Sequence, residues 1–343
     1  MAKRTQFSLG NCNLYNLNEP GNAIYTDSDG WSQEQYDKKI DWMQRTFREM
    51  PSDVWGFQEL WHKDSINTVF NHPDLAGYTC LVPPTHTGQK IICGAAVKTS
   101  ILHGDPTWIS DFPAEYKMMA GGDDAQSSDI AVQLDTFSRP VLHFKVKPRS
   151  NGRLVSVYVV HLKSKLPSKI YYEGWYKANK DYYKKHTEAI GAGLATIRRT
   201  AEAVALRMIL TEEMKNTDTP VVVLGDLNDG HRTNTLNIIT GQPNYILSGL
   251  DKGGGDIDLY SVASLQAFRS ERNVYYTHIH QNIQETLDHI MVSQEFYDNS
   301  RKRRWAFKGM DIRNDHLNED NHKADGSTDH GVVRAKFEYR PAK

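Results

Sequence analysis

The sequence lacks several features that would place the protein in a specialised class. It has no apolar run approaching the roughly 18 residues of a membrane span, and no apolar signal core follows the basic residues near its start. We therefore expect no membrane span and, by default, a cytoplasmic location. The cysteines are few. Cys12, Cys80 and Cys93 fit neither a zinc motif nor an even-numbered disulfide framework, so they are expected to be buried free thiols.

The chain also lacks a strong charge of one sign. Its 343 residues carry a formal net charge of −1, so any binding of nucleic acid has to rely on a local basic patch. No repeat of fixed period, low-complexity tract or Pro/Ser-rich linker divides the sequence. We therefore predict a single domain over residues 1–343.

The sequence does contain a mixture of helix and strand patterns. A helix is predicted over 31–50, where Ser32 and Gln35 match a capping box and Pro51 follows the end. A long helix is predicted over 186–215. Its expected apolar side consists of Ile190, Leu194, Ile197, Ala201, Val204 and Met208.

Strand patterns are more numerous than helix patterns. They occur at 53–60, 91–97, 141–146, 154–162, 221–224, 273–279, 286–293 and 330–339. Because they lie in both halves of the chain, two sheets packed face to face and covered by helices fit better than a doubly wound parallel sheet.

Several of the apolar strands end in amide, carboxylate or imidazole side chains. These are Asn13, Asn16, Gln58, Glu59, His161, Asp226, Asn228, Asp288, His289, Asp329 and His330. Taken singly, Asn13 can be a turn residue, Glu59 a solvated strand end, and Asp226 with Asn228 an Asx turn. Asp288 is a stronger indication, because it lies within an apolar strand and a buried carboxylate requires a partner.

Taken together, these residues match what phosphodiester hydrolysis requires. A hard divalent cation binds carboxylate and amide oxygens, which Glu59, Asp329 and Asn13 supply. An Asp–His pair can activate water. Suitable donors to the phosphate oxygens are His161, Asn228 and Lys163. The sequence shows no thiolate or His-rich zinc set, which favours Mg²⁺ or Mn²⁺ over zinc.

The order of these motifs resembles the endonuclease/exonuclease/phosphatase superfamily, which has the deoxyribonuclease I-like fold. The segments are N-L-Y-N-L at 13–17, Q-E at 58–59, H-L-K-S-K at 161–165, G-D-L-N-D at 225–229, L-D-H-I at 287–290 and T-D-H-G at 328–331. Each is short, and their joint order over nearly the whole chain carries the resemblance. The helix pattern at 198–210 is similar to a bacterial, nuclease-like branch. The resemblance implies a four-layered α/β (α+β) sandwich with two central, mostly antiparallel sheets flanked by helices, and a metal-dependent phosphoesterase.

The resemblance also implies roles for most of these polar residues. Those implied at the metal are Glu59, as the principal carboxylate, Asn13 and Asp329. Asp226 and Asn228 would hold the attacking water and the scissile phosphate. His330 would face the phosphate or act as the general base, oriented by Asp288. His161 would donate to the phosphate or to the leaving group. Whether an aspartate or a histidine takes the proton stays open.

One departure from compact members of the superfamily is the long interval between His161 and Asp226. The extra residues, about 165–193, alternate lysine with tyrosine and tryptophan. The lysines expected to bind substrate are Lys177, Lys180, Lys184 and Lys185. Such a mixture beside an active-site strand can follow a phosphate backbone and stack on bases. The alternative is a solvated helical insertion whose aromatic side chains pack on the domain.

We therefore predict a metal-dependent phosphodiesterase, and first of all a nuclease that acts on DNA or, alternatively, RNA. Two other functions stay open. A phosphatase or phospholipase-type diesterase of the same superfamily would need a compact pocket or a membrane-facing hairpin. A non-catalytic nucleic-acid-binding module would have lost acidic or histidine positions, and here all of the main ones are present.

Overall fold

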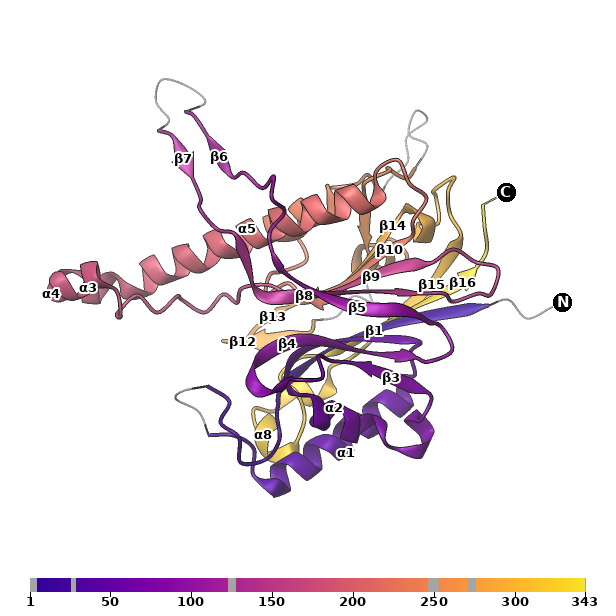
Figure 1. Ribbon diagram of the computed structural model, residues 1–343, viewed down its shortest axis with the longest axis horizontal. Helices are drawn as coiled ribbons and strands as arrows, with labels where there is room; N and C mark the ends of the chain where they lie inside the picture. The colour runs from indigo at the N-terminus through magenta and orange to yellow at the C-terminus, as the bar shows by residue number, and fades with distance from the viewer. Residues whose placement is uncertain (1–4, 26–28, 123–127, 246–252, 271–275, 343) are drawn as a thin grey trace.

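The computed structural model describes residues 5–25, 29–122, 128–245, 253–270 and 276–342. Figure 1 shows four layers in the order helices, sheet, sheet, helices. Helices α1 (Gln33–Glu49) and α2 (Lys63–Phe70) cover one outer face, and the long α5 (Thr187–Met214) runs along the other. This arrangement confirms the four-layered sandwich predicted from the sequence.

The first sheet combines strands from both ends of the described chain. Its strands are β1 (Gln6–Leu17), β2 (Val54–His62), β3 (Tyr78–Leu81), β4 (Thr87–Lys98), β15 (Trp305–Arg313) and β16 (Val332–Tyr339). They lie in the order β15-β16-β1-β2-β4-β3. β1 and β2 are parallel, and the remaining neighbours are antiparallel.

The second sheet is built in the same way from the middle of the chain. Its strands are β5 (Leu102–Asp111), β8 (Thr136–Val146), β9 (Val155–His161), β10 (Val221–Asp226), β11 (Leu259–Ser261) and β14 (Asp288–Ser293). They lie in the order β11-β14-β10-β9-β8-β5, with β9 and β10 as the parallel pair. Each sheet is therefore mostly antiparallel, as predicted.

Smaller elements extend from the sandwich. Two hairpins are formed by β6 (Met119–Ala120) with β7 (Ile130–Ala131), and by β12 (His278–His280) with β13 (Ile283–Glu285). Short helices are α3 (Gly174–Ala178), α4 (Lys180–Tyr183), α6 (Asn234–Thr240), α7 (Val262–Ala267) and α8 (His322–Asp325). Single 3₁₀ turns are η1 (Pro73–Leu75), η2 (Lys184–His186), η4 (Gln294–Phe296) and η5 (Asp315–Asn318). α3 and α4 lie at the free end of α5, beyond the sheets (Figure 1). Within the described ranges, no helix combines the length and apolar character needed to cross a bilayer.

Several local predictions are confirmed. Helix α1 begins after Ser32, whose hydroxyl accepts from the Gln35 N–H while the Gln35 side chain accepts from the Ser32 N–H, so the capping box is formed. All three cysteines are free; Cys12 and Cys93 are buried and Cys80 is partly buried.

Two predictions differ from the structure. The strand predicted over 273–279 begins only at His278 as β12, and residues 273–275 lie outside the described residues. The apolar side predicted for α5 is wrong at Leu194 and Ile197, which are 44% and 45% exposed. The period of 3.6 residues identifies an apolar stripe, but the first part of α5 extends past the sheets and leaves that stripe uncovered (Figure 1).

One of the hydrophobic core clusters lies between the two sheets and brings them close together near the functional residues. Leu9 and Val54 of the first sheet pack in one cluster with Val159 and Leu224 of the second. Full burial of each such side chain stabilises the fold by about 1.5–3 kcal/mol. Gly56 of β2 permits the close approach, because a Cβ there would lie 3.0 Å from the Leu224 Cβ.

Candidate active site

The carboxyl ends of the two parallel strand pairs meet, and polar side chains gather where they do. The first sheet supplies Asn13 from β1 and Glu59 from β2. The second supplies His161 and Asp226, the last residues of β9 and β10, which are register neighbours. Asp288, the first residue of β14, pairs with Asp226 from the other side. The topology therefore collects residues that are distant in sequence.

The chain turns sharply after β10. The Asp226 carboxylate accepts a hydrogen bond from the Asn228 N–H at 2.7 Å, which closes an Asx turn. Asn228 has a left-handed φ of 52°, and its side-chain amide donates to the Leu162 carbonyl at 3.0 Å. The residue before the turn, Gly225, has to be a glycine, because a Cβ there would lie 2.3 Å from the Val160 carbonyl oxygen. The turn therefore holds the side chains of Asp226 and Asn228 in place at the site.

Side-chain hydrogen bonds connect the two sheets across the site. Asn13 Nδ2 donates to Asp226 Oδ2 at 3.2 Å, and Asn11 Nδ2 donates to Asp288 Oδ1 at 3.3 Å. Gln58 Nε2 donates to Asn11 Oδ1 at 2.9 Å. All five side chains are buried, so their mutual hydrogen bonds offset the cost of removing them from water. Sequence reasoning gave no role to Asn11 or Gln58. The alternation that puts Asn11 on the same strand face as Asn13 was the available signal.

His330 is held in place by Asp288. His330 Nδ1 lies 2.8 Å from Asp288 Oδ2, and His330 Nε2 lies 4.0 Å from Asp226 Oδ2. Burial opposes the charged imidazole, but the negative charges of Asp288 and Asp226 outweigh it and hold the pKa of His330 well above its usual value. At neutral pH, His330 is therefore an imidazolium whose orientation Asp288 fixes.

Asp226 lies at the centre of the cluster and is 1% exposed. Burial raises the pKa of Asp226 to about 7; the positive charge of His330 opposes this shift and the negative charge of Asp288 adds to it. A carboxylate that titrates near neutral pH can both accept and release a proton there.

His161 lies on the opposite side of Asp226 from β14. Its Nε2 is 3.6 Å from Asp226 Oδ2, and its Nδ1 is buried without a hydrogen-bond partner among the described residues. Burial, together with the nearby Arg139 guanidinium, holds the pKa of His161 well below its usual value. His161 is therefore a neutral imidazole. Arg139, which sequence reasoning missed, donates to the Leu162 carbonyl at 3.2 Å.

Glu59 lies on a strained part of β2. Its φ of 58° is unusual for a residue with a side chain, and pairing with β4 shifts register between Phe57 and Leu60. Glu59 Oε2 accepts from the Asn16 N–H at 3.0 Å. Burial and the negative charge of Asp329 raise the pKa of Glu59. Asp329 Oδ1 is buried and, within the described chain, has no hydrogen-bond partner. Two neighbouring carboxylates, one with an orphaned oxygen, fit a hard divalent cation.

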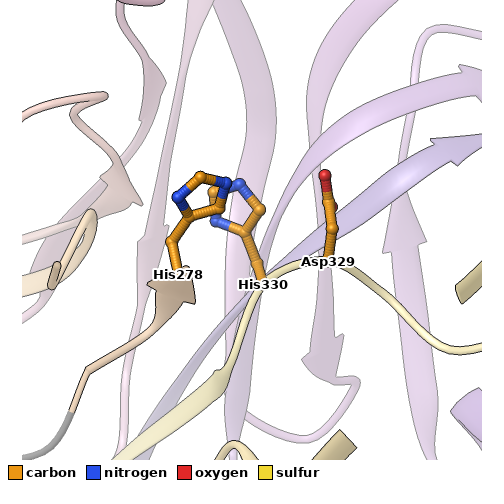
Figure 2. A group of neighbouring side chains, drawn as sticks. All are labelled: His278, Asp329 and His330. Carbon is orange, nitrogen blue, oxygen red and sulfur yellow. The ribbon is translucent and has the colours of Figure 1, made fainter. Parts of the chain in front are cut away.

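His278, the first residue of β12, also lies at the site. Its ring centroid is 4.9 Å from that of His330. One potential ligand atom from each of His278, Asp329 and His330 lies within 4.8 Å of the others (Figure 2). The sequence did not indicate this set, because His278 is far from Asp329 along the chain and no short motif links them.

The lysines expected to bind substrate are not part of this cluster. Lys163 Nζ donates to the Leu166 carbonyl at 3.0 Å, within its own loop. The other four are exposed on α3, α4 and η2 at the free end of α5 (Figure 1): Lys177, Lys180, Lys184 and Lys185. Exposed Trp175 and Tyr182 lie among them, while Tyr176 is buried. Their role in binding stays a prediction.

The sequence over residues 39–330 matches the profile of the Endonuclease/Exonuclease/phosphatase family. The chain therefore belongs to that family, whose members are hydrolases of phosphoesters and generally use divalent metal ions. A search of curated proteins found no matching relative.

Solved structures share the fold over nearly the whole chain. An endonuclease/exonuclease/phosphatase from Bacteroides vulgatus has a TM-score of 0.56 at 14% identity, covering 98% of this chain and 100% of that one. D. rerio TDP2, complexed with a single-strand DNA product, has a TM-score of 0.55 at 13% identity, with 97% and 99% covered. The mannosyl-6-phosphatase of Bacteroides thetaiotaomicron has a TM-score of 0.51 at 14% identity, with 96% and 99% covered. At such identities the likeness shows the fold alone.

Proposed function

We propose that the protein is a metal-dependent phosphodiesterase and, more specifically, a nuclease that hydrolyses DNA. The observation that carries the proposal is the position of Asp226. This buried carboxylate has a pKa of about 7 and lies within 4.0 Å of His161, His330 and Asn13 atoms. Such a centre is suited to take a proton from water while the surrounding donors hold a phosphate.

Glu59, Asp329 and Asn13 would hold the divalent cation, Mg²⁺ or Mn²⁺, because oxygen ligands suit such ions. When bound, the cation supplies positive charge opposite the phosphate oxygens. The backbone N–H groups of Asn16 and Tyr15 donate to Glu59 Oε2 and Asn13 Oδ1, at 3.0 and 2.9 Å. These contacts orient both side chains before any ligand arrives.

The proton and the phosphate would be handled by different groups. Asp226 takes a proton from water, whose oxygen forms the bond to phosphorus while the bond to the leaving oxygen breaks; that oxygen departs as an alkoxide and takes a proton from solvent water. His330, an imidazolium oriented by Asp288, donates to a non-bridging phosphate oxygen. His161 and Asn228 complete the set of donors around the phosphate. This division assigns the base role to the aspartate, because the raised pKa of His330 keeps that ring protonated.

The exposed segment at the free end of α5 favours a polymeric substrate. Lys177, Lys180, Lys184 and Lys185 would contact phosphates of the backbone away from the scissile bond, and the exposed Trp175 would stack on a base. Lys163 would donate to a phosphate nearer the cleavage position, which requires its Nζ to leave the Leu166 carbonyl.

A substrate panel tests the proposal. Plasmid DNA, single-stranded DNA, RNA, bis-p-nitrophenyl phosphate and inositol phosphates are each incubated with Mg²⁺, Mn²⁺ or Ca²⁺, with and without EDTA. We expect hydrolysis of DNA that EDTA abolishes and that the Asp226→Ala variant lacks. Failure to cleave DNA or RNA with any of these metals would overturn the nuclease proposal.

The same panel separates the alternatives. A phosphatase or phospholipase-type diesterase would turn over small phosphoesters in preference to polymers, using the same Asp226 centre. A non-catalytic module would bind nucleic acid without turnover of any substrate. The basic and aromatic segment around Lys180 is the observation that favours the polymer.

A further inference from the structure

Strand β12 is fixed to the catalytic segments through Thr277. The buried Thr277 Oγ1 accepts from the Asp288 N–H at 3.1 Å. The Thr277 carbonyl accepts from the Gly331 N–H at 2.7 Å. One residue thus ties the start of β12 to the segments that carry Asp288 and His330. His278 follows Thr277 directly and is held against the His330 ring.

The geometry around His278 brings three potential metal ligands together. The potential ligand atoms of His278, Asp329 and His330 lie within 4.8 Å of one another. A tetrahedral ion with bonds of about 2.0–2.2 Å separates its ligand atoms by about 3.4 Å, so small side-chain rotations complete the set. Figure 2 shows the two rings side by side, with the Asp329 carboxylate next to His330.

Some of the potential ligand atoms of this cluster make no hydrogen bond within the described part of the chain. Asp329 Oδ1 and His278 Nδ1 are buried and, in the described part of the chain, have no hydrogen-bond partner. Asp288 occupies the Nδ1 atom of His330 and leaves Nε2 available. A carboxylate on the far nitrogen is the usual support of a metal-binding histidine, because it fixes the ring and its tautomer.

The donor types differ from those beside Glu59. Two imidazole nitrogens with one carboxylate suit borderline transition ions, whereas carboxylate and amide oxygens suit Mg²⁺. We propose that His278, Asp329 and His330 form a second cation site that takes a borderline transition ion such as Zn²⁺ or Co²⁺. The site lies beside the oxygen-rich site of Glu59 and Asn13 and shares the Asp329 carboxylate with it, and its existence does not depend on the substrate of the enzyme.

An ion bound at this site would remove the hydrogen-bond donor of His330 Nε2. Ligation requires an unprotonated nitrogen, so the ion takes the place of a proton on His330 Nε2. The same atom cannot hold the ion and donate to a phosphate at the same time. The cluster therefore links binding of a transition ion to loss of a phosphate contact.

Cobalt spectroscopy tests the proposal directly. The full-length protein, stripped with EDTA and returned to excess Mg²⁺, is titrated with Co²⁺ while its visible d–d absorption is recorded. We expect a protein-bound Co²⁺ spectrum of low coordination number. His278→Ala should weaken Co²⁺ binding by at least about tenfold, and His278→Gln, which retains a side chain of similar reach, should weaken it as well.

Two variants serve as controls for this experiment. His280→Ala removes an exposed histidine of the same strand and should leave Co²⁺ binding unchanged. Glu59→Gln should also retain the Co²⁺ spectrum, because Glu59 belongs to the other site. Wild-type affinity in both His278 variants, or a spectrum in the wild type no different from that of hydrated Co²⁺, would overturn the proposal.

Discussion

Asp288 Oδ2 and His330 Nδ1 lie 2.8 Å apart, although 42 positions separate the two residues along the chain. Asp288 begins β14 in the second sheet, and His330 precedes β16 in the first. The contact therefore forms only when the two sheets are packed together. It fixes both the direction and the charge of the imidazole that faces Asp226.

Replacing Asp288 with asparagine keeps the shape of the side chain and removes its charge. The pKa of His330 should fall, because the carboxylate that raises it is gone. The alkaline limb of the pH–rate profile should then move to lower pH, and the rate should drop by about 10²–10⁴-fold. The kcat/KM of D288N for a small diester, measured against pH, checks this. An unmoved alkaline limb would assign that limb to another group.

Asp226→Asn should separate activity from stability. The folded-state pKa of Asp226 is raised from 3.8 to about 7, so the folded protein binds the carboxyl proton more tightly than the unfolded chain does. Stability from this group is fully present below the unfolded pKa and is lost as the pH rises through about 7. Asparagine does not ionise. The Tm of D226N relative to wild type should therefore be higher by a few degrees near pH 8 than near pH 5, while hydrolysis is lost. Thermal melts at both pH values check this, and an equal difference at the two would contradict it.

Glu59→Gln should weaken the response to the divalent cation rather than the response to substrate. The glutamine keeps an oxygen that can accept from the Asn16 N–H but lacks the charge. We expect the Mg²⁺ concentration for half-maximal activity to rise at least about tenfold, with partial recovery at saturating Mg²⁺. Glu213→Gln, at a partly exposed carboxylate that faces Lys145, is the control and should behave as wild type. A normal Mg²⁺ titration in E59Q would place the ion elsewhere.

The lysines at the free end of α5 should matter only for polymers. Changing Lys177, Lys180, Lys184 and Lys185 to glutamine should raise the KM for single-stranded DNA. The slope of log KM against log salt should flatten by up to about 3. Hydrolysis of bis-p-nitrophenyl phosphate should stay unchanged, because that diester is too small to reach this segment.

A charge-matched control makes this result specific. It replaces four exposed lysines on other parts of the surface: Lys38, Lys90, Lys215 and Lys308. If both quadruple variants lose affinity equally, net charge accounts for the effect. If neither changes the salt slope, the segment is a solvated insertion, as the alternative interpretation holds.

Local and short-range features were predictable from the sequence. The capping box of Ser32 and Gln35 places the start of α1, and the uninterrupted apolar run before Asp226 predicts a buried strand. The order of short motifs then predicts the sandwich, because each motif follows a strand that the fold brings to the same edge.

Features that depend on distant packing were not predictable in this way. His278 joins the site through Thr277, which belongs to none of the short motifs and is hydrogen-bonded to Gly331 only in the folded chain. Leu194 and Ile197 satisfy the helical period, but periodicity does not tell how far a helix extends past the layer it covers. The division of the chain into a single domain stays a prediction.

The hydrogen bonds from Asn13 to Asp226 and from Asn11 to Asp288 have a consequence for how the enzyme fails. Half of the site belongs to each sheet, so a small slip of one sheet over the other separates the halves while both sheets keep their strands paired. Loss of activity therefore reports a shift of one sheet relative to the other. In a urea titration it should disappear before the far-ultraviolet circular dichroism of the strands and helices changes.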